Sequence, residues 1–186
     1  MSMVNVTGRD IAALLNPRPV ALITCCDKAG QPNILSVTWT MPVSHEPPII
    51  AISIAPSRHS HSLLLETNEF VLNIVGQSFR NAVETCGNCS GKSADKFAEA
   101  ALQTQKSLCV RPPRIAGALG YLECHIEERQ AVGDHSLFLA HVLHAEALEK
   151  AFPGVWDTET GDVLLCRQRD QFGYCEISES GEAERA

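Results

Sequence analysis

Serines, histidines and one arginine follow an apolar run in the first third of the chain. The run covers residues 49–54 and is followed by the sequence APSRHSHS. Hydroxyl groups, a guanidinium and the free N–H groups of a helix start are the donors that bind phosphate. Serine is also a common helix N-cap, so a plain capped turn explains the same residues. The stretch predicts an anion site at Ser57, Arg58 and Ser60, with helix capping as the alternative.

Hydroxyl side chains also recur at every second position of a strand expected over residues 33–41. Ser36, Thr38 and Thr40 fall on one face of such a strand, and Trp39 falls on the other. A half-exposed strand shows this alternation without any ligand. If the strand lies near the APSRHSHS stretch, the two would form a groove for a flat aromatic ligand with a phosphate tail.

A Cys-x-x-Cys pair occurs at Cys86 and Cys89. Such a pair can form a redox disulfide or supply half of a four-thiolate metal site. No second pair with this spacing occurs, which disfavours zinc or an iron–sulfur cluster, so we expect no bound metal. A redox pair and two reduced thiols in a loop remain as alternatives.

Length and composition indicate one globular domain over residues 1–186, with a core at about 17–149 and a C-terminal extension at 150–186. The chain is 45% hydrophobic and 20% charged, which is ordinary for a soluble protein. A net charge of −7 without a dense basic cluster argues against nucleic-acid binding, so a bound phosphate would belong to a small molecule. No apolar run could span a bilayer and no secretory leader is evident, so we expect a cytoplasmic protein that binds no membrane.

Apolar periodicity predicts mostly strands joined by short connections. The short connections and the lack of regularly alternating helices favour an antiparallel barrel over a doubly wound sheet. No GxGxxG follows a strand and no GxxxxGK[ST] occurs, so neither of those nucleotide-binding motifs is present. The strands are expected at 20–26, 33–41, 49–54, 70–75, 118–128 and 136–149, with a further apolar run at 163–166, and helical segments at 7–15, 60–67 and, irregularly, 78–106.

Short motifs occur in a characteristic order between residues 17 and 149. They are Arg18–Thr24, Asn33 with Ser36, Thr38 and Trp39, Glu46-Pro47-Pro48, the run 49–54, Ser57 with Arg58 and Ser60, Glu69–Ile74, Asp95-Lys96-Phe97, and Gly133-Asp134-His135. Each motif is weak alone, but together and in this order they are fairly specific. The chain resembles the flavin reductase-like family of FMN-binding split-barrel proteins, in particular its flavoredoxin branch.

This resemblance implies a fold, a cofactor and the residues that bind it. The fold would be mainly β with peripheral helices, a six-stranded antiparallel Greek-key split barrel that forms a homodimer with FMN near the subunit interface. His135 matches the position tied in the family to nicotinamide binding or hydride transfer, although Gly-Asp before a strand is also an ordinary hairpin turn. The implied FMN-binding residues are Asn33, Ser36, Thr38 and Trp39 along the flavin, and Ser57, Arg58 and Ser60 at its phosphate with Lys96 nearby.

The function expected from this resemblance is that of an FMN flavoprotein that takes a hydride from NAD(P)H. It would pass electrons to a flavin, an iron compound or a redox protein partner, and Cys86 and Cys89 could exchange electrons with the flavin. One alternative is an electron carrier of the flavoredoxin type that has no nicotinamide activity. An alternative of another class is a flavin-free barrel that binds a different small ligand.

Overall fold

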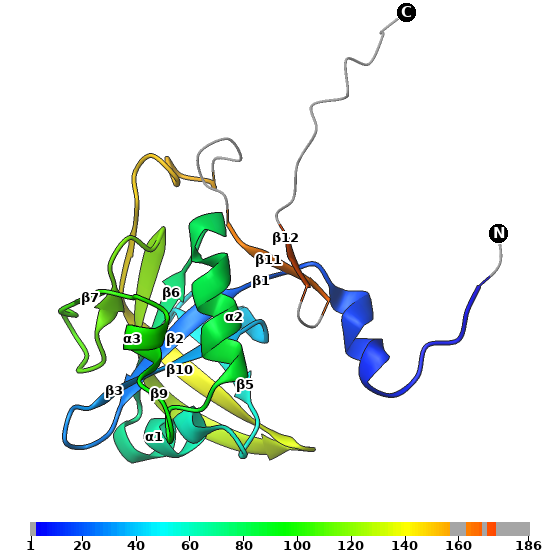
Figure 1. Cartoon of the computed structure of the whole chain (residues 1–186), viewed down its shortest axis with the longest axis horizontal. Helices are drawn as coiled ribbons and strands as arrows, with labels where there is room; N and C mark the ends of the chain where they lie inside the picture. The colour runs from blue at the N-terminus through cyan, green and yellow to red at the C-terminus, as the bar shows by residue number, and fades with distance from the viewer. Residues whose placement is uncertain (1–2, 157–162, 169–170, 174–186) are drawn as a thin grey trace, which may run out of the picture.

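The structure is a computed structural model that describes residues 3–156, 163–168 and 171–173 (Figure 1). Its α-helices are α1 His59–Thr67, α2 Arg80–Asn88 and α3 Lys96–Glu99, and its 3-10 helices are η1 Gly8–Leu15 and η2 Gln77–Phe79. Its strands are β1 Arg18–Pro19, β2 Ala21–Cys26, β3 Pro32–Val37, β4 Thr40–Ser44, β5 Ile49–Ile54, β6 Glu69–Ile74, β7 Thr104–Gln105, β8 Arg114–Ile115, β9 Gly120–Val132, β10 His135–Ala147, β11 Leu165–Gln168 and β12 Gln171–Gly173.

The main sheet closes into a barrel. Among the described residues its strand order is β3-β2-β6-β9-β10-β5-β4, and every neighbouring pair is antiparallel. The two edge strands, β3 and β4, are joined by only Thr38 and Trp39, so the chain itself connects one edge of the sheet to the other. When β3 and β4 are counted as one interrupted strand, the barrel has the six antiparallel strands that were predicted.

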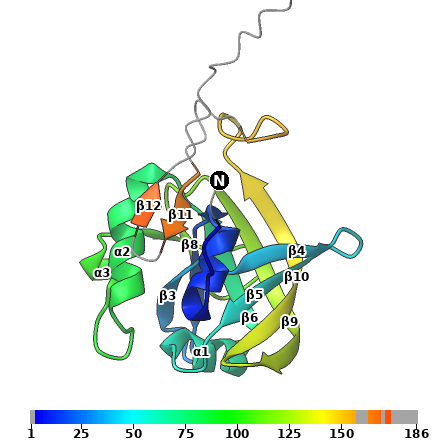
Figure 2. The same ribbon diagram turned by 90° about the vertical axis from the view of Figure 1, so that its right-hand side faces the viewer.

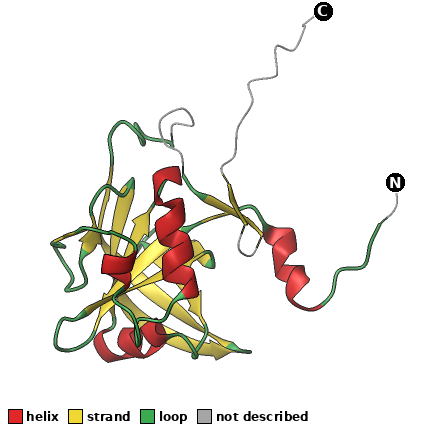
Figure 3. Ribbon diagram, in the orientation of Figure 1, coloured by secondary structure: helices red, strands yellow, loops and turns green. Residues whose placement is uncertain are grey.

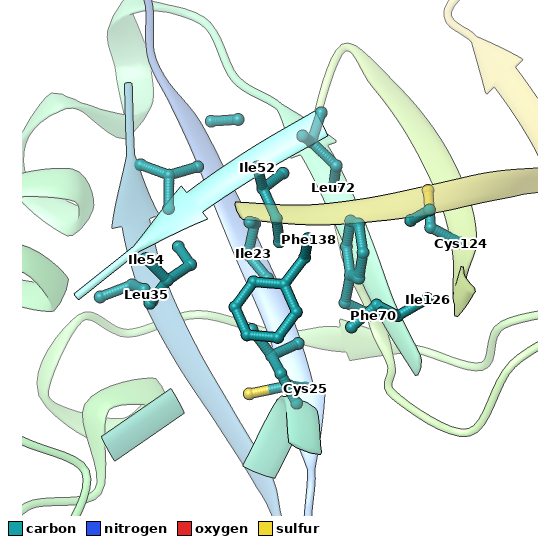
Figure 4. Packing of buried hydrophobic residues seen from close by; sticks show 14 of the residues in the cluster. Ile23, Cys25, Leu35, Ile52, Ile54, Phe70, Leu72, Cys124, Ile126 and Phe138 are labelled. Carbon is teal, nitrogen blue, oxygen red and sulfur yellow. The ribbon is translucent and has the colours of Figure 1, made fainter. Parts of the chain in front are cut away.

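The strands of the barrel are buried on both faces where helices cover them. On β2, Ile23 and Cys25 point into the barrel, where they pack with Phe70 and Phe138 (Figure 4). The alternate residue Leu22 packs outside the barrel against Val83 of α2. This two-sided burial explains why β2 reads as an almost continuous apolar run rather than as an alternating one.

The helices position the polar residues of the site. α1 follows β5 after the short turn 55–58, and its residues Leu63 and Leu64 pack against the barrel interior. α2 packs outside the barrel (Figure 3), and its residues Val83 and Cys86 belong to a second apolar cluster with Leu22 of β2 and Ile34 of β3. The chain between α2 and α3 therefore passes close to β3 and to the start of α1.

Two sequence-based expectations about the second strand are wrong. The strand predicted at 33–41 ends at Val37, and β4 begins at Thr40 in a segment partly predicted as a loop. Ser36 points toward α2, whereas Thr40 pairs with Ile52, which faces the barrel interior. Paired residues of an antiparallel sheet share a face. Ser36 and Thr40 therefore do not share a face, because regular alternation is broken where the chain crosses between the sheet edges.

Further differences are local. The segment predicted at 78–106 contains η2, α2 and only a single-turn α3, with the break near 87–91 that its Gly and Ser residues predict. The expected helix at 7–15 is the 3-10 helix η1, and Thr7 makes no side-chain capping bond. His61, in the segment predicted as helical at 60–67, is buried in α1, and its Nε2 lies 2.9 Å from Oγ of Ser136.

The apolar run at 163–166 packs onto the barrel. Leu164 is fully buried in the second apolar cluster, and its carbonyl accepts a hydrogen bond from N–H of Val20. β11 pairs with β1 and β12 to form a small sheet that lies with η1 at one side of the barrel (Figure 2). Within the described ranges, no helix is both long and apolar enough to cross a membrane.

Candidate functional site

The turn between β5 and α1 supplies one wall of a small pocket. Arg58 is the N-cap residue of α1, and its carbonyl accepts a hydrogen bond from N–H of His61, which leaves the N–H groups of His59 and Ser60 at the start of this nine-residue helix. Ser57 and Arg58 are exposed, whereas Ser60 is buried. All three residues line the same pocket, whose volume is about 90 Å³. The structure thus brings together the three residues predicted from the APSRHSHS stretch.

The chain between α2 and α3 forms the opposite wall. Cys89, Ser90 and Gly91 line the pocket there, together with Lys96 at the start of α3. α3 begins here because the Asp95 carboxylate caps it, accepting hydrogen bonds from the N–H groups of Phe97 and Ala98.

Lys96 fixes this wall to the barrel. Its buried ammonium group donates to the carbonyl oxygens of Ile34 and Cys86, each at 2.9 Å, which leaves one of its three N–H donors. Burial is the main cause that lowers the pKa of Lys96, and the nearby guanidinium of Arg58 lowers it further. Two cations therefore face one pocket, and an anion bound there would relieve their repulsion.

Asn33 and Gly91 meet at the edge of the pocket. Nδ2 of Asn33 donates to Oγ of Ser60 at 2.7 Å, which links β3 to α1. A Cβ atom on Gly91 would lie only 2.0 Å from Oδ1 of Asn33 and 3.3 Å from Cδ2 of His59. Only a residue without a side chain lets the two walls come this close. Nδ1 of His59 is buried here and makes no hydrogen bond within the described part of the chain.

Three other predicted residues lie outside this pocket. The hydroxyl of Ser36 donates to the carbonyl oxygen of Val83 at 2.6 Å, so it ties β3 to α2. Thr38 and Trp39 form the short link between β3 and β4. The structure thus places Ser36, Thr38 and Trp39 farther along the same segment as Asn33 but not around the pocket.

His135 and Trp39 form a second polar and aromatic cluster. Their ring centroids are 4.7 Å apart with an interplanar angle of 27°, which is a stacked arrangement. They meet because N–H of Ser53 on β5 donates to the carbonyl of Trp39, while Ser53 pairs with Leu137 of β10 on the other side. Nδ1 of His135 lies 2.7 Å from the exposed carboxylate of Asp134. The carboxylate orients the ring and leaves Nε2 for another partner.

The turn that carries His135 depends on glycine. Gly133 has a φ of +58°, in the left-handed region, and lies between β9 and β10. Asp134 and His135 follow it directly, so the hairpin turn and the candidate histidine are parts of one feature. The two interpretations weighed for the Gly-Asp-His motif are therefore compatible.

Cys86 and Cys89 are free thiols in the structure. Burial raises the pKa of Cys86 to about 11 and also raises the pKa of Cys89. Cys89 is the C-cap residue of α2, where the negative end of the helix dipole further disfavours a thiolate. Both thiols are therefore protonated near neutral pH, and the redox role of the pair stays a prediction. The described residues contain no cluster of three or more His, Cys, Asp or Glu able to hold a metal ion.

Sequence reasoning did not assign Leu35, Ser90 or Gly91 to the pocket, although all three line it. Ser90 and Gly91 were treated only as a helix break. The Gly and Ser composition around 87–91 marked an irregular segment, but nothing in the pattern indicated that it faces α1. Only the packing of α2 against β3 brings it there.

Comparisons with known proteins support this fold. The flavoredoxin of Desulfovibrio vulgaris (Miyazaki F) is similar over 100% of this chain and 99% of its own, with a TM-score of 0.84 and 19% identity. The FMN-binding protein of Thermus thermophilus, solved with bound 1-cyclohex-2-enone, is similar over 94% of this chain and 93% of its own, with a TM-score of 0.79 and 22% identity. Both similarities confirm the mainly β split-barrel fold.

A relative and a family model are similar to this chain in sequence. The reductase component of 4-nitrophenol 4-monooxygenase/4-nitrocatechol 2-monooxygenase from Rhodococcus opacus is 26% identical over 118 residues, which are 63% of this chain and 60% of that protein. The model of the flavin reductase like domain matches residues 14–167, beyond the core expected at 17–149. The resemblance inferred from the sequence motifs is confirmed, and the chain belongs to the flavin reductase-like domain family.

Proposed function

We propose that this protein binds FMN and works as a flavin reductase-like oxidoreductase with NAD(P)H as its electron donor. The pocket of Ser57, Arg58, Ser60 and Lys96 is the observation that carries this proposal. It offers two cations, two hydroxyl groups and the N-terminal N–H groups of α1 to one small anion. The buried, unpaired Nδ1 of His59 in the same pocket also fits a ligand that supplies a polar partner.

These residues fit the phosphate of FMN by their chemistry. Arg58 would bind phosphate oxygens with its planar fork, and Ser57 and Ser60 would add hydroxyl donors. Lys96 keeps the α2–α3 wall in place and has one N–H left for the anion. Bound FMN would supply the chemistry, accepting a hydride and releasing electrons to an acceptor.

His135 is the proposed catalytic residue for the reaction with the electron donor NAD(P)H. Asp134 holds its Nδ1, so Nε2 can make a hydrogen bond to the nicotinamide carboxamide or stabilise the donor as it approaches. Relatives support the assignment to this class of function: one is named as a monooxygenase reductase component and another as an FMN-binding protein. The acceptor would be a flavin, an iron compound or a redox protein.

The first test is the visible absorption of the purified protein with FMN, before and after anaerobic addition of NADH or NADPH. Flavin absorption that is retained on gel filtration and bleached by either donor supports the proposal. Arg58→Ala should weaken FMN binding about tenfold or more, because a hydrogen bond to a charged group contributes about 1.5–3 kcal/mol. Arg80→Ala removes an exposed cation outside the pocket and serves as the matched control. Equal FMN affinity in both variants would contradict the role of Arg58.

A flavoredoxin-type electron carrier is the second candidate function. One observation favours it: the indole of Trp39 stacks on the ring of His135 and covers one face of the imidazole, so that this face is closed to a nicotinamide. A carrier would retain FMN but would not be bleached by NADH or NADPH. A flavin-free ligand-binding barrel, the remaining alternative, predicts that the protein takes up no FMN at all.

We also propose that the protein forms a homodimer through the outer face of β4. Met41 and Val43 are both more than one third exposed on this face, and a second copy of the chain would cover these apolar side chains. Met41→Glu should shift the protein to monomers in sedimentation equilibrium. A wild-type protein that is monomeric at micromolar concentration would contradict the proposal.

A further inference from the structure

Arg18 is a cation without an anionic partner in the part of the chain that the structure describes. Its guanidinium lies over the ring of Trp39, with Cζ 5.8 Å from the ring centroid. Its Nε is buried and makes no hydrogen bond within the described residues. A buried donor without a partner is unfavourable by about 1–3 kcal/mol, so the arrangement favours a ligand that accepts this hydrogen bond.

The backbone holds Arg18 in this position. Pro17 and Pro19 flank it and restrict its conformation. β1 pairs with β11 through Arg18 and Cys166, and N–H of Val20 donates to the carbonyl of Leu164 at 2.8 Å. Arg18 thus belongs to a fixed piece of sheet, in which β1 pairs with β11. An anion would meet a pre-organised fork there rather than a freely rotating surface side chain.

The indole under Arg18 also contacts His135. Trp39 therefore connects the unpaired cation, at 5.8 Å, with the candidate donor-side histidine, at 4.7 Å. Asp134 is the carboxylate of this cluster, and it interacts with His135. These distances place the guanidinium within the length of a dinucleotide from the imidazole. A ligand whose aromatic head reaches His135 could extend an anionic group to Arg18.

We propose that Arg18 binds the pyrophosphate of the nicotinamide dinucleotide donor while the nicotinamide end lies at His135. This inference rests on the proposed reductase function. The FMN phosphate is the other anion in the system, but the pocket at Ser57, Arg58 and Lys96 already provides its donors. Arginine matches pyrophosphate oxygens because its planar fork can donate two parallel hydrogen bonds.

Two hydride donors distinguish the contribution of the pyrophosphate to binding from that of the nicotinamide ring. NADH carries the pyrophosphate, whereas 1-benzyl-1,4-dihydronicotinamide has the dihydropyridine ring without any phosphate. In the FMN-loaded protein, Arg18→Ala should raise KM for NADH about tenfold to a hundredfold and change KM for the benzyl donor less than about twofold. Arg18→Lys should recover part of the loss, because lysine keeps the charge but not the fork. Arg80→Ala should behave like the wild type with both donors.

A binding measurement without turnover completes the test. ADP-ribose has the pyrophosphate but no nicotinamide, and calorimetry should show that Arg18→Ala weakens its binding by the same factor as it raises KM for NADH. Equal effects on both hydride donors, loss of FMN affinity, a changed oligomeric state, or no ADP-ribose binding to the wild type would each overturn the inference. If the wild type oxidises neither donor, the reductase function fails, while the ADP-ribose titration still decides whether Arg18 binds a pyrophosphate.

Discussion

Gly91→Ala tests the pocket more sharply than removal of any of its charged groups. The added Cβ would lie 2.0 Å from Oδ1 and 2.8 Å from Cγ of Asn33. Both distances are far inside van der Waals contact, so one of the two groups must move. Asn33 is buried and donates to Ser60, whereas Gly91 lies in the chain between α2 and α3. The substitution therefore either breaks the hydrogen bond between Asn33 and Ser60 or displaces the chain between α2 and α3.

The size of the effect follows from these contacts. If Asn33 turns away, its bond to Ser60 is lost inside the protein, at a cost of about 1–3 kcal/mol. For a chain of this length, such a loss lowers Tm by about 2–12 °C. Either movement displaces a residue that borders or lines the pocket, so we also expect FMN to bind about tenfold more weakly. We therefore predict a lower Tm together with weaker FMN binding.

Gly87→Ala is the matched control for this prediction. Gly87 lies in α2, and a Cβ there would be 3.8 Å from Cβ of Ser36, which is an ordinary contact. Because alanine favours a helix over glycine, this variant should keep FMN affinity and gain up to about 1 kcal/mol of stability. Thermal unfolding of the apoprotein and fluorescence titration with FMN measure both quantities. If Gly91→Ala matches the wild type in both, the description of the pocket is wrong.

Two further predictions concern buried ionisable groups away from the pocket. Glu123 is fully buried and accepts hydrogen bonds from Nε of Arg114 and from the N–H groups of Leu108 and Cys109, and these contacts lower its pKa despite burial. Glu123→Gln should lower the free energy of unfolding by about 3 kcal/mol in urea titration, whereas the exposed control Glu84→Gln should change it by less than about 1 kcal/mol. Burial lowers the pKa of His61 below 6.5, so the unfolded chain binds a proton more readily, and stability present above pH 6.5 is lost as pH falls below it. His61→Gln should flatten this dependence between pH 7.5 and 5.5, and a curve parallel to the wild type would refute the assignment.

Much of the fold could be predicted from the sequence because its signals are local. The apolar runs at 49–54 and 70–75 mark β5 and β6, and the polar stretch after the first run marks the start of α1. The long strands β9 and β10 also follow from their apolar residues and from the turn between them. What failed was the segment 33–41, where alternation alone predicts one continuous strand. The break at Thr38 and Trp39 arises from closure of the barrel, which no local pattern encodes.

The candidate site was predictable to a similar extent. Ser57, Arg58 and Ser60 are close in sequence, and one turn is enough to bring them together. Lys96 reaches the same pocket only because α2 packs against β3, and its family motif rather than its local pattern identified it. Arg18 lies far in sequence from His135 and carries no local signal of binding. Its guanidinium lies over Trp39, which is 21 residues away in the sequence, and this contact exists only in the folded chain.

The distance between the pocket and the His135 cluster limits the length of a single ligand that contacts both. Leu35 lines the pocket, and Trp39, four residues later, contacts His135. Four residues of extended chain span at most about 13 Å. A single ligand that reaches both sites must therefore hold its anion and its aromatic ring no farther apart than about that distance. FMN has this form, which supports its place in the proposal, whereas inorganic phosphate could fill the pocket but would be too short to reach His135. Inorganic phosphate should therefore compete with FMN for the pocket and weaken FMN binding.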